Sequence, residues 1–130
     1  MNKKQQASFH LDRQRLGVFG EEIAAAEYRR LGYDILEANY HSRFGELDLI
    51  ACSENCIVFV EVRTRDATAA ITPAETVTIH KQRRLILTAQ HYLQQNPELA
   101  DMAMRFDVVE VFYHGGYDYR LNRIENAFTL

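Results

Sequence analysis

The chain has 130 residues, 47% of them apolar, and this composition supports a single folded domain. No run of residues approaches the length of a membrane span and the N-terminus has no apolar signal segment, so we expect a cytoplasmic protein without membrane contact. The formal net charge of −3 argues against a general polyanion-binding protein, although 12 of the 15 cationic residues are Arg, the better bidentate phosphate ligand.

The N-terminal part of the chain predicts an arm followed by a helix. Residues 1–12 are polar and lack an apolar period, so we expect a flexible arm ahead of a single domain over residues 13–130. A helix is predicted from Val18 to Leu31, before Gly32, which suits the position after a helix C-cap. Its apolar stripe consists of Ala24, Ala25, Tyr28 and Leu31.

Glu21 lies on the apolar stripe of this helix. An acidic side chain on an inward face needs a partner. Two explanations stay open. The charge complements the helix dipole near the N-terminus, or Glu21 is a third acidic member of a metal site on the following strands.

Three strands follow the helix. The first covers residues 32–40. The next two are the short, apolar runs Gly45–Ala51 and Ile57–Arg63, which read as buried strands. A tight turn centred on Glu54 and Asn55 joins them into a hairpin.

Asp48 and Glu61 are symmetric about that turn, so the hairpin places the two carboxylates opposite each other, with Cβ atoms about 4.5–5.5 Å apart. Like charges this close repel unless a cation lies between them. Two oxygen ligands on rigid strands suit Mg²⁺ or Mn²⁺, which often bind through one or two carboxylates and a substrate phosphate. Arg63 shares a face with Glu61, which puts a guanidinium where a phosphate would need it.

The segment after the hairpin predicts a loop and a second long helix. Small residues from Asp66 to Thr72 predict a mobile loop, and Thr72–Glu75 has the form of a capping box. The long helix runs from Thr78 to about Gln95. Its inward stripe is expected to contain Leu85, Thr88, Ala89, Tyr92 and Leu93.

Two strands complete the domain. A fourth strand is predicted over residues 105–112 and a fifth, edge strand over residues 119–124, with a turn at Gly115–Gly116 between them. The order α-β-β-β-α-β-β predicts an α/β fold with a central mixed sheet flanked by helices.

Basic residues cluster at the start of the second helix. Lys81, Arg83 and Arg84 lie in its first turns, where the helix dipole disfavours cations, so contact with phosphate is one explanation and a solvated face with acidic partners is the other. Arg43 and Arg65 are expected to extend the same surface, and under the first explanation they bind nucleic acid as well.

Three further polar residues are interpreted as structural. Cys52 and Cys56 flank the hairpin turn and are expected to be reduced thiols, with a disulfide as the alternative. Asp107 lies between apolar residues on the fourth strand and is expected to pair with Arg105 or with a cation on a helix.

The chain carries, in order, Gly17-x-x-Gly20-Glu21-x-x-Ala24, Gly32-Tyr33, Gly45-Glu46-Leu47-Asp48-Leu49-Ile50, Phe59-Val60-Glu61-Val62-Arg63-x-Arg65, Lys81-x-x-Arg84-Leu85, Tyr92-Leu93 and Arg105-Phe106-Asp107-Val108. Together these motifs, from about residue 16 to the C-terminus, resemble the bacterial YraN-like family, whose function is uncharacterised. The fold of that family is similar to Holliday-junction resolvases and to the tRNA-endonuclease-like domain of the restriction-endonuclease-like nuclease superfamily.

The resemblance implies a site of an acid, an Asp and a Glu-x-Lys motif, matched here by Glu21, Asp48 and Glu61. Arg63 stands where the superfamily has Lys, and a guanidinium does not lose its proton in proteins, so Arg63 suits phosphate contact and not general-base catalysis. The implied protein is a metal-dependent endonuclease or resolvase-like hydrolase that acts on structured DNA with Mg²⁺ or Mn²⁺.

Two other functions stay open at this level. One is a non-catalytic nucleic-acid-binding module on a nuclease fold, which the Arg63 departure and the acidic pI favour. The other is an adaptor for protein partners. DNA is the expected nucleic acid, and a homodimer is an open alternative to a monomer.

Overall fold

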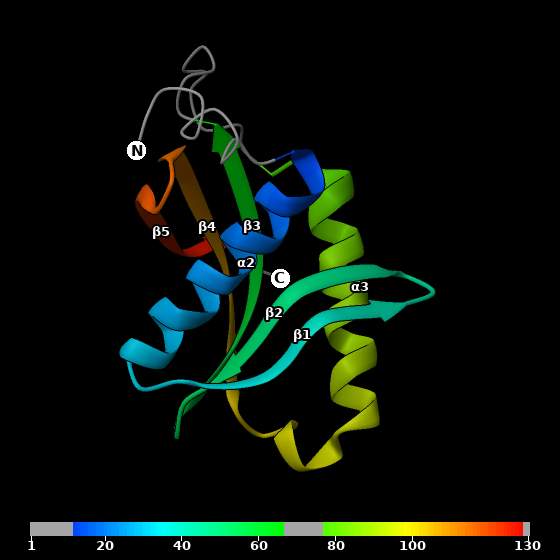
Figure 1. Cartoon of the computed structure of the whole chain (residues 1–130). Helices are drawn as coiled ribbons and strands as arrows, with labels where there is room; N and C mark the ends of the chain where they lie inside the picture. The colour runs from blue at the N-terminus through cyan, green and yellow to red at the C-terminus, as the bar shows by residue number, and fades with distance from the viewer. Residues whose placement is uncertain (1–11, 67–76, 129–130) are drawn as a thin grey trace, which may run out of the picture.

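A computed structural model describes residues 12–66 and 77–128. Its elements, in chain order, are α2 (Arg13–Arg30), β1 (Asp34–Ser42), β2 (Gly45–Cys52), β3 (Cys56–Asp66), α3 (Ile79–Gln95), the 3₁₀ turn η1 (Pro97–Leu99), β4 (Ala103–Gly115) and β5 (Asp118–Phe128) (Figure 1). The predicted order α-β-β-β-α-β-β is confirmed. Apart from Asp12 and Asp66, the predicted arm, loop and capping box lie outside the described residues.

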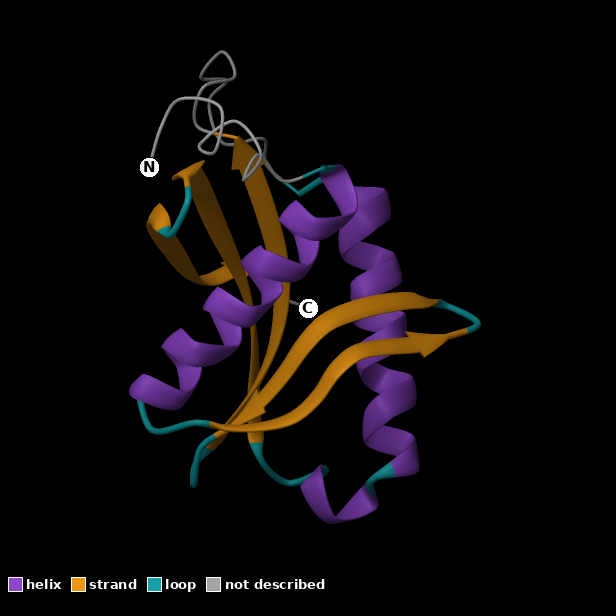
Figure 2. Ribbon diagram, viewed as in Figure 1, coloured by secondary structure: helices purple, strands orange, loops and turns teal. Residues whose placement is uncertain are grey.

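The strands form one mixed sheet in the order β1-β2-β3-β4-β5. Neighbouring strands are antiparallel except β3 and β4, which are parallel and joined through α3. A parallel pair needs such a crossover, and Figure 2 shows α2 and α3 on opposite sides of the sheet. β5 is an edge strand, as predicted. Neither helix among the described residues is long and apolar enough to cross a membrane.

Helix α2 begins earlier than the apolar pattern predicts. The side chain of Asp12 accepts a hydrogen bond from the Arg15 N–H at 2.8 Å and so caps a helix that starts at Arg13 and not at Val18. The helix ends where expected, because Gly32 adopts φ +93°, a conformation that favours glycine.

The buried face of α2 differs from the predicted stripe at one end. Ala24, Ala25 and Tyr28 are buried as predicted, but Leu31 is exposed because it lies at the C-cap, where the chain leaves the helix. Nearer the start of the helix, Gly20 is also buried, and it packs against Thr64 of β3. A bare glycine thus permits close contact between the helix and the sheet.

Helix α3 agrees with its prediction. Thr78 is the N-cap, and its side chain accepts a hydrogen bond from the Lys81 N–H at 3.2 Å. The helix ends at Gln95 before Asn96, and its buried residues are those predicted: Leu85, Thr88, Ala89 and Tyr92. Leu93, the last residue predicted for this stripe, is partly buried against the same cluster.

The two helices cover opposite faces of the sheet. Because successive strand residues point to opposite faces, each helix meets its own set of apolar side chains. Val58 and Val60 of β3 pack with α2, whereas Ile57 and Phe59 pack with α3. Cys52 packs on the α3 side and Cys56 on the α2 side, and both thiols are free. Their opposite orientation separates them, in agreement with the predicted reduced state.

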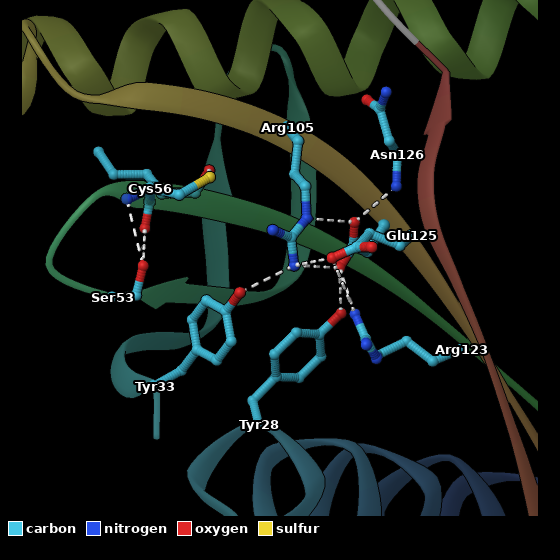
Figure 3. A network of polar contacts seen from close by, with 10 residues as sticks. Tyr28, Tyr33, Ser53, Cys56, Arg105, Arg123, Glu125 and Asn126 are labelled. Carbon is cyan, nitrogen blue, oxygen red and sulfur yellow. Dashed lines mark hydrogen bonds and ion pairs between the residues drawn. The ribbon is translucent and has the colours of Figure 1, made fainter. Parts of the chain in front are cut away.

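Asp107 is fully buried at the centre of a polar network. Figure 3 shows its partners Tyr28, Arg105, Arg123 and Asn126. It accepts hydrogen bonds from the Tyr28 hydroxyl at 2.6 Å, from Arg105 Nε at 3.0 Å and from the Asn126 N–H at 2.9 Å. Arg123 Nη1 lies 3.6 Å from the same carboxylate. The predicted pairing with Arg105 is confirmed, and the second cation comes from β5 and not from a helix.

Candidate functional site

The site begins where β2 and β3 separate. The two strands pair from Cys52↔Ile57 to Leu49↔Val60, the register that the hairpin prediction requires. One residue further, the backbone pairing of β2 with β3 ends. There the Val62 N–H of β3 donates a hydrogen bond to the side-chain Oδ2 of Asp48, at 2.7 Å. Beyond this point the β1–β2 hairpin turns away from β3 towards α3 (Figure 1).

The packing of β2 also changes at this point. Leu49 packs on the α2 side, whereas Leu47 packs with the α3 cluster. The pairing of β2 with β1 is regular through both residues, at Ala38↔Leu49 and Tyr40↔Leu47, so the difference follows the bend of the β1–β2 hairpin and not a strand irregularity (Figure 1).

A cleft lies between β2, β3 and α3, with a volume of about 260 Å³. Its lining combines acidic and basic side chains with one apolar residue: Glu46, Asp48, Glu61, Lys81, Arg84 and Leu85. Asp48 and Glu61 therefore share one cavity, as the sequence predicts.

Asp48 is disfavoured as an anion in this cleft. Burial, together with the nearby Glu61 carboxylate, raises the pKa of Asp48 to about 7. The hydrogen bond from Val62 and the charge of Lys81 lower this pKa, and Glu21 raises it. Glu61 is better compensated, because the Lys81 ammonium contacts its Oε1.

Glu21 does not line the cleft. It lies on α2, partly buried, and acts on Asp48 through its charge. Among residues 12–66 and 77–128, no group of three or more His, Cys, Asp or Glu side chains is gathered closely enough to hold a metal ion. Since α2 starts at Arg13, Glu21 is well beyond its first turn, so the explanation of Glu21 by the helix dipole is wrong.

The predicted cations lie in different places. Lys81 and Arg84 line the cleft, while Arg83 is exposed on α3. Arg43 lies at the β1–β2 turn, with its guanidinium 4.8 Å from the centre of the Phe44 ring. Arg63 and Arg65 follow Glu61 at alternate positions of β3, which gives the three residues one face of the sheet.

Sequence reasoning did not identify Glu46 or the Lys81–Glu61 contact. Glu46 lies opposite His41 in the β1–β2 register, and the His41 Nδ1 and Glu46 Oε1 atoms are 3.3 Å apart. Its position two residues before Asp48 was a signal for a shared face. The Lys81 contact has no comparable local signal, because β3 and α3 are separate elements.

The cleft presents carboxylate oxygens and cationic donors side by side. Two carboxylates of one hairpin offer oxygen ligands of the kind that Mg²⁺ and Mn²⁺ prefer. Lys81 and Arg84 offer charged donors of the kind that phosphate accepts. The fold and the cleft thus define an α/β protein with a mixed acidic and basic site between the antiparallel strands β2 and β3 and helix α3.

The chain belongs to the Uncharacterised protein family UPF0102, whose family model matches residues 20–111. This confirms the resemblance to the YraN-like family. The matched region includes Asp48, Glu61, Lys81 and Arg84, so the whole cleft lies inside it.

Several relatives match most of the chain. A UPF0102 protein of Syntrophomonas wolfei is 44% identical over 113 residues, which cover 87% of this chain and 96% of the relative. A UPF0102 protein of Clostridium botulinum is 40% identical over 116 residues, 88% of this chain and 94% of the relative. One of Alkaliphilus oremlandii is 42% identical over 115 residues, 88% of this chain and 97% of the relative.

Proposed function

We propose that this chain binds nucleic acid, with structured DNA as its main substrate. It would hydrolyse phosphodiester bonds with a divalent cation held by Asp48 and Glu61. The observation that carries the proposal is the placement of Asp48. A carboxyl with its pKa raised to about 7 by burial and by Glu61 lies beside that second acid in a cleft that also holds Lys81 and Arg84.

The donor set fits Mg²⁺ or Mn²⁺. Both candidate ligands are carboxylates on one hairpin, and one or two carboxylates with substrate phosphate are a frequent Mg²⁺ environment. A bound cation would compensate the two neighbouring charges, polarise a phosphoryl oxygen and lower the pKa of an attacking water. Glu21 would add negative charge from α2 without completing a set of three ligands.

The chain's own residues would orient the substrate. The Val62 N–H fixes the direction of the Asp48 carboxylate, and the pairing of β3 with β4 fixes the strand that carries Glu61. Arg84 and Lys81 would bind the phosphodiester from the α3 side. Arg63 would stabilise negative charge that develops on the phosphoryl oxygens through its guanidinium group.

A non-catalytic nucleic-acid-binding module is the second candidate. It is favoured by the contact of Lys81 with Glu61, which already neutralises one of the two acids. In that case the cleft would bind phosphate through its cations, and no cleavage would follow.

Cleavage assays on duplex, flap, four-way-junction and single-stranded DNA, each with Mg²⁺ or Mn²⁺, test the proposal. We expect cleavage that requires the metal and is lost in Asp48→Asn and Glu61→Gln. Glu54→Gln is the matched control, because Glu54 is an exposed acid at the turn of the same hairpin. It should leave cleavage unchanged.

Binding measured in parallel separates the two candidates. Salt-sensitive binding with no cleavage of any substrate would reject the hydrolase and support the binding module. Cleavage that persists in Asp48→Asn or Glu61→Gln would place the reactive site elsewhere. Absence of both binding and cleavage would reject both candidates.

A further inference from the structure

Lys81 has a polar partner for its side chain and another for its backbone N–H. Its ammonium contacts Oε1 of Glu61, whose side chain is only 11% exposed, while the Lys81 side chain is 39% exposed. Its backbone N–H donates to Oγ1 of Thr78, the N-cap of α3, at 3.2 Å. A fixed helix start thus carries a long, flexible side chain to a carboxylate on β3.

The position of Lys81 is electrostatically unfavourable within its own helix. The N-terminal end of a helix carries partial positive charge, and α3 has no acidic residue in its first turn. Glu61 supplies the missing negative charge from β3. In return, the ammonium neutralises a mostly buried acid beside Asp48. Each charge therefore stabilises the other while no other cation is bound.

We propose that Lys81 is the resident counter-ion of the Asp48–Glu61 pair and that a divalent cation binds there only when the ammonium leaves Glu61. This inference rests on the proposed function, because it takes the two carboxylates as metal ligands. The ammonium contacts the Glu61 oxygen that would coordinate the metal ion. A metal ion at that oxygen and the Lys81 ammonium would repel each other. Lys81 therefore lowers the affinity of the site for metal.

The displaced ammonium has a second partner available in the cleft. Lys81 and Arg84 line the same cavity, so a phosphodiester bound there would meet both side chains. Phosphate is a strong acceptor for an ammonium group. A phosphate that attracts Lys81 away from Glu61 favours metal binding, and linkage requires that metal favours phosphate binding equally. Lys81 thus makes the site selective for metal and nucleic acid together.

Calorimetric titration of the full chain with MnCl₂, without nucleic acid, tests the inference independently of activity. Lys81→Met removes the charge at similar length, and we expect its Kd for Mn²⁺ to fall about tenfold. Lys81→Arg retains the charge and should keep the wild-type Kd. Arg84→Met is the matched control, because Arg84 lines the same cavity without an ion pair to a carboxylate in the described part of the chain. Its Kd should change much less.

The outcomes separate this inference from the proposed function. Suppose wild type binds Mn²⁺, Asp48→Asn does not, and Lys81→Met binds no more tightly than wild type. The metal site would then stand and the counter-ion role would be overturned. An equal gain in Arg84→Met would also overturn it, because the effect would then be general to any cation of the cleft. No Mn²⁺ binding by any variant would reject both. Thermal melts in EDTA establish that each variant is folded. If Lys81→Met does not fold, Lys81→Gln takes its place in the titration.

Discussion

A single carboxyl, that of Asp48, is placed where its ionised form is disfavoured. Its hydrogen bond with the Val62 N–H shows that the side chain also has a structural partner. The folded-state pKa of about 7 exceeds the ordinary value of 3.8, so the folded protein retains a proton that the unfolded chain releases. The contribution of Asp48 to stability is thus present below about pH 3.8 and is lost as the pH rises through about 7.

Replacement of Asp48 by Asn should therefore change stability in a pH-dependent way. The amide oxygen can still accept from Val62, while the charge is removed. In EDTA at about pH 8, we expect Asp48→Asn to unfold with a free energy higher by roughly 0–2 kcal/mol, and the gain should shrink towards about pH 4.5. Thermal melts across this range measure it. A strong loss of stability at high pH would instead identify Asp48 as a structural partner.

The packing of α2 depends on one of its two helical glycines. A Cβ atom built on Gly20 would lie 1.7 Å from Thr64 Oγ1 and 2.8 Å from Thr64 Cβ, whereas one on Gly17 would meet nothing within 4 Å. Both glycines belong to the first family motif, and only Gly20 is buried. The close approach of α2 to β3 is therefore fixed at Gly20.

The same substitution at these two positions should have opposite effects. Gly20→Ala forces the helix or Thr64 to move and should destabilise the protein by roughly 1–3 kcal/mol, beyond the gain in helix propensity. Gly17→Ala has room and should stabilise by up to about 1 kcal/mol. Urea unfolding of the two variants measures both values. Equal effects of the two substitutions would contradict the close contact.

The start of α3 provides a second comparison within one element. Lys81 and Arg84 line the cleft and Arg83 does not, so their roles in binding should differ. The double variant Lys81→Ala/Arg84→Ala should weaken DNA binding and flatten its salt dependence by up to about 0.9 per lost phosphate contact. Arg83→Ala should change the slope less. Fluorescence anisotropy at several salt concentrations measures the slopes, and equal loss in both variants would widen the binding surface beyond the cleft.

The Asp107 network connects parts of the chain that are distant in sequence. It joins Tyr28 of α2, Arg105 of β4 and Arg123 of β5 around one buried carboxylate, as Figure 3 shows. Arg105 Nη2 also donates to the Tyr33 hydroxyl at 3.0 Å, just before β1. This buried network lies on the α2 side of the sheet, whereas the cleft opens on the α3 side, so its role is structural.

Loss of the central charge should destabilise the whole fold. Asp107→Asn leaves Arg105 and Arg123 without their buried counter-charge, and we expect a loss of about 3–5 kcal/mol, the usual scale for breaking a buried ion pair. The matched control is Glu125→Gln, which removes a 55% exposed carboxylate from the same two arginines. It should change stability by less than about 1 kcal/mol. Urea unfolding tests both, and a small effect of Asp107→Asn would contradict the structural role.

Local patterns in the sequence determine the elements of this protein and the register of its central hairpin. The 3.6-residue period identifies the buried face of α3, and Thr78 identifies its start. The symmetric apolar runs about Glu54 and Asn55 fix the pairing that brings Asp48 beside Glu61. These features depend on residues close together in the chain, so periodicity and turn chemistry are enough to predict them. The early start of α2 was not predicted, because Arg13–Gly17 has no apolar period and Asp12 is the only signal of the cap.

Only the tertiary structure determines how these elements meet. The sequence does not show that β2 leaves β3 at Asp48, that Glu21 stays outside the cleft or that Lys81 contacts Glu61. It also does not show which buried partners surround Asp107. Each of these contacts joins elements whose relative position is set by packing of the two helices on opposite faces of the sheet. No local pattern carries that information, because the free energy of such contacts arises only once the faces are buried together.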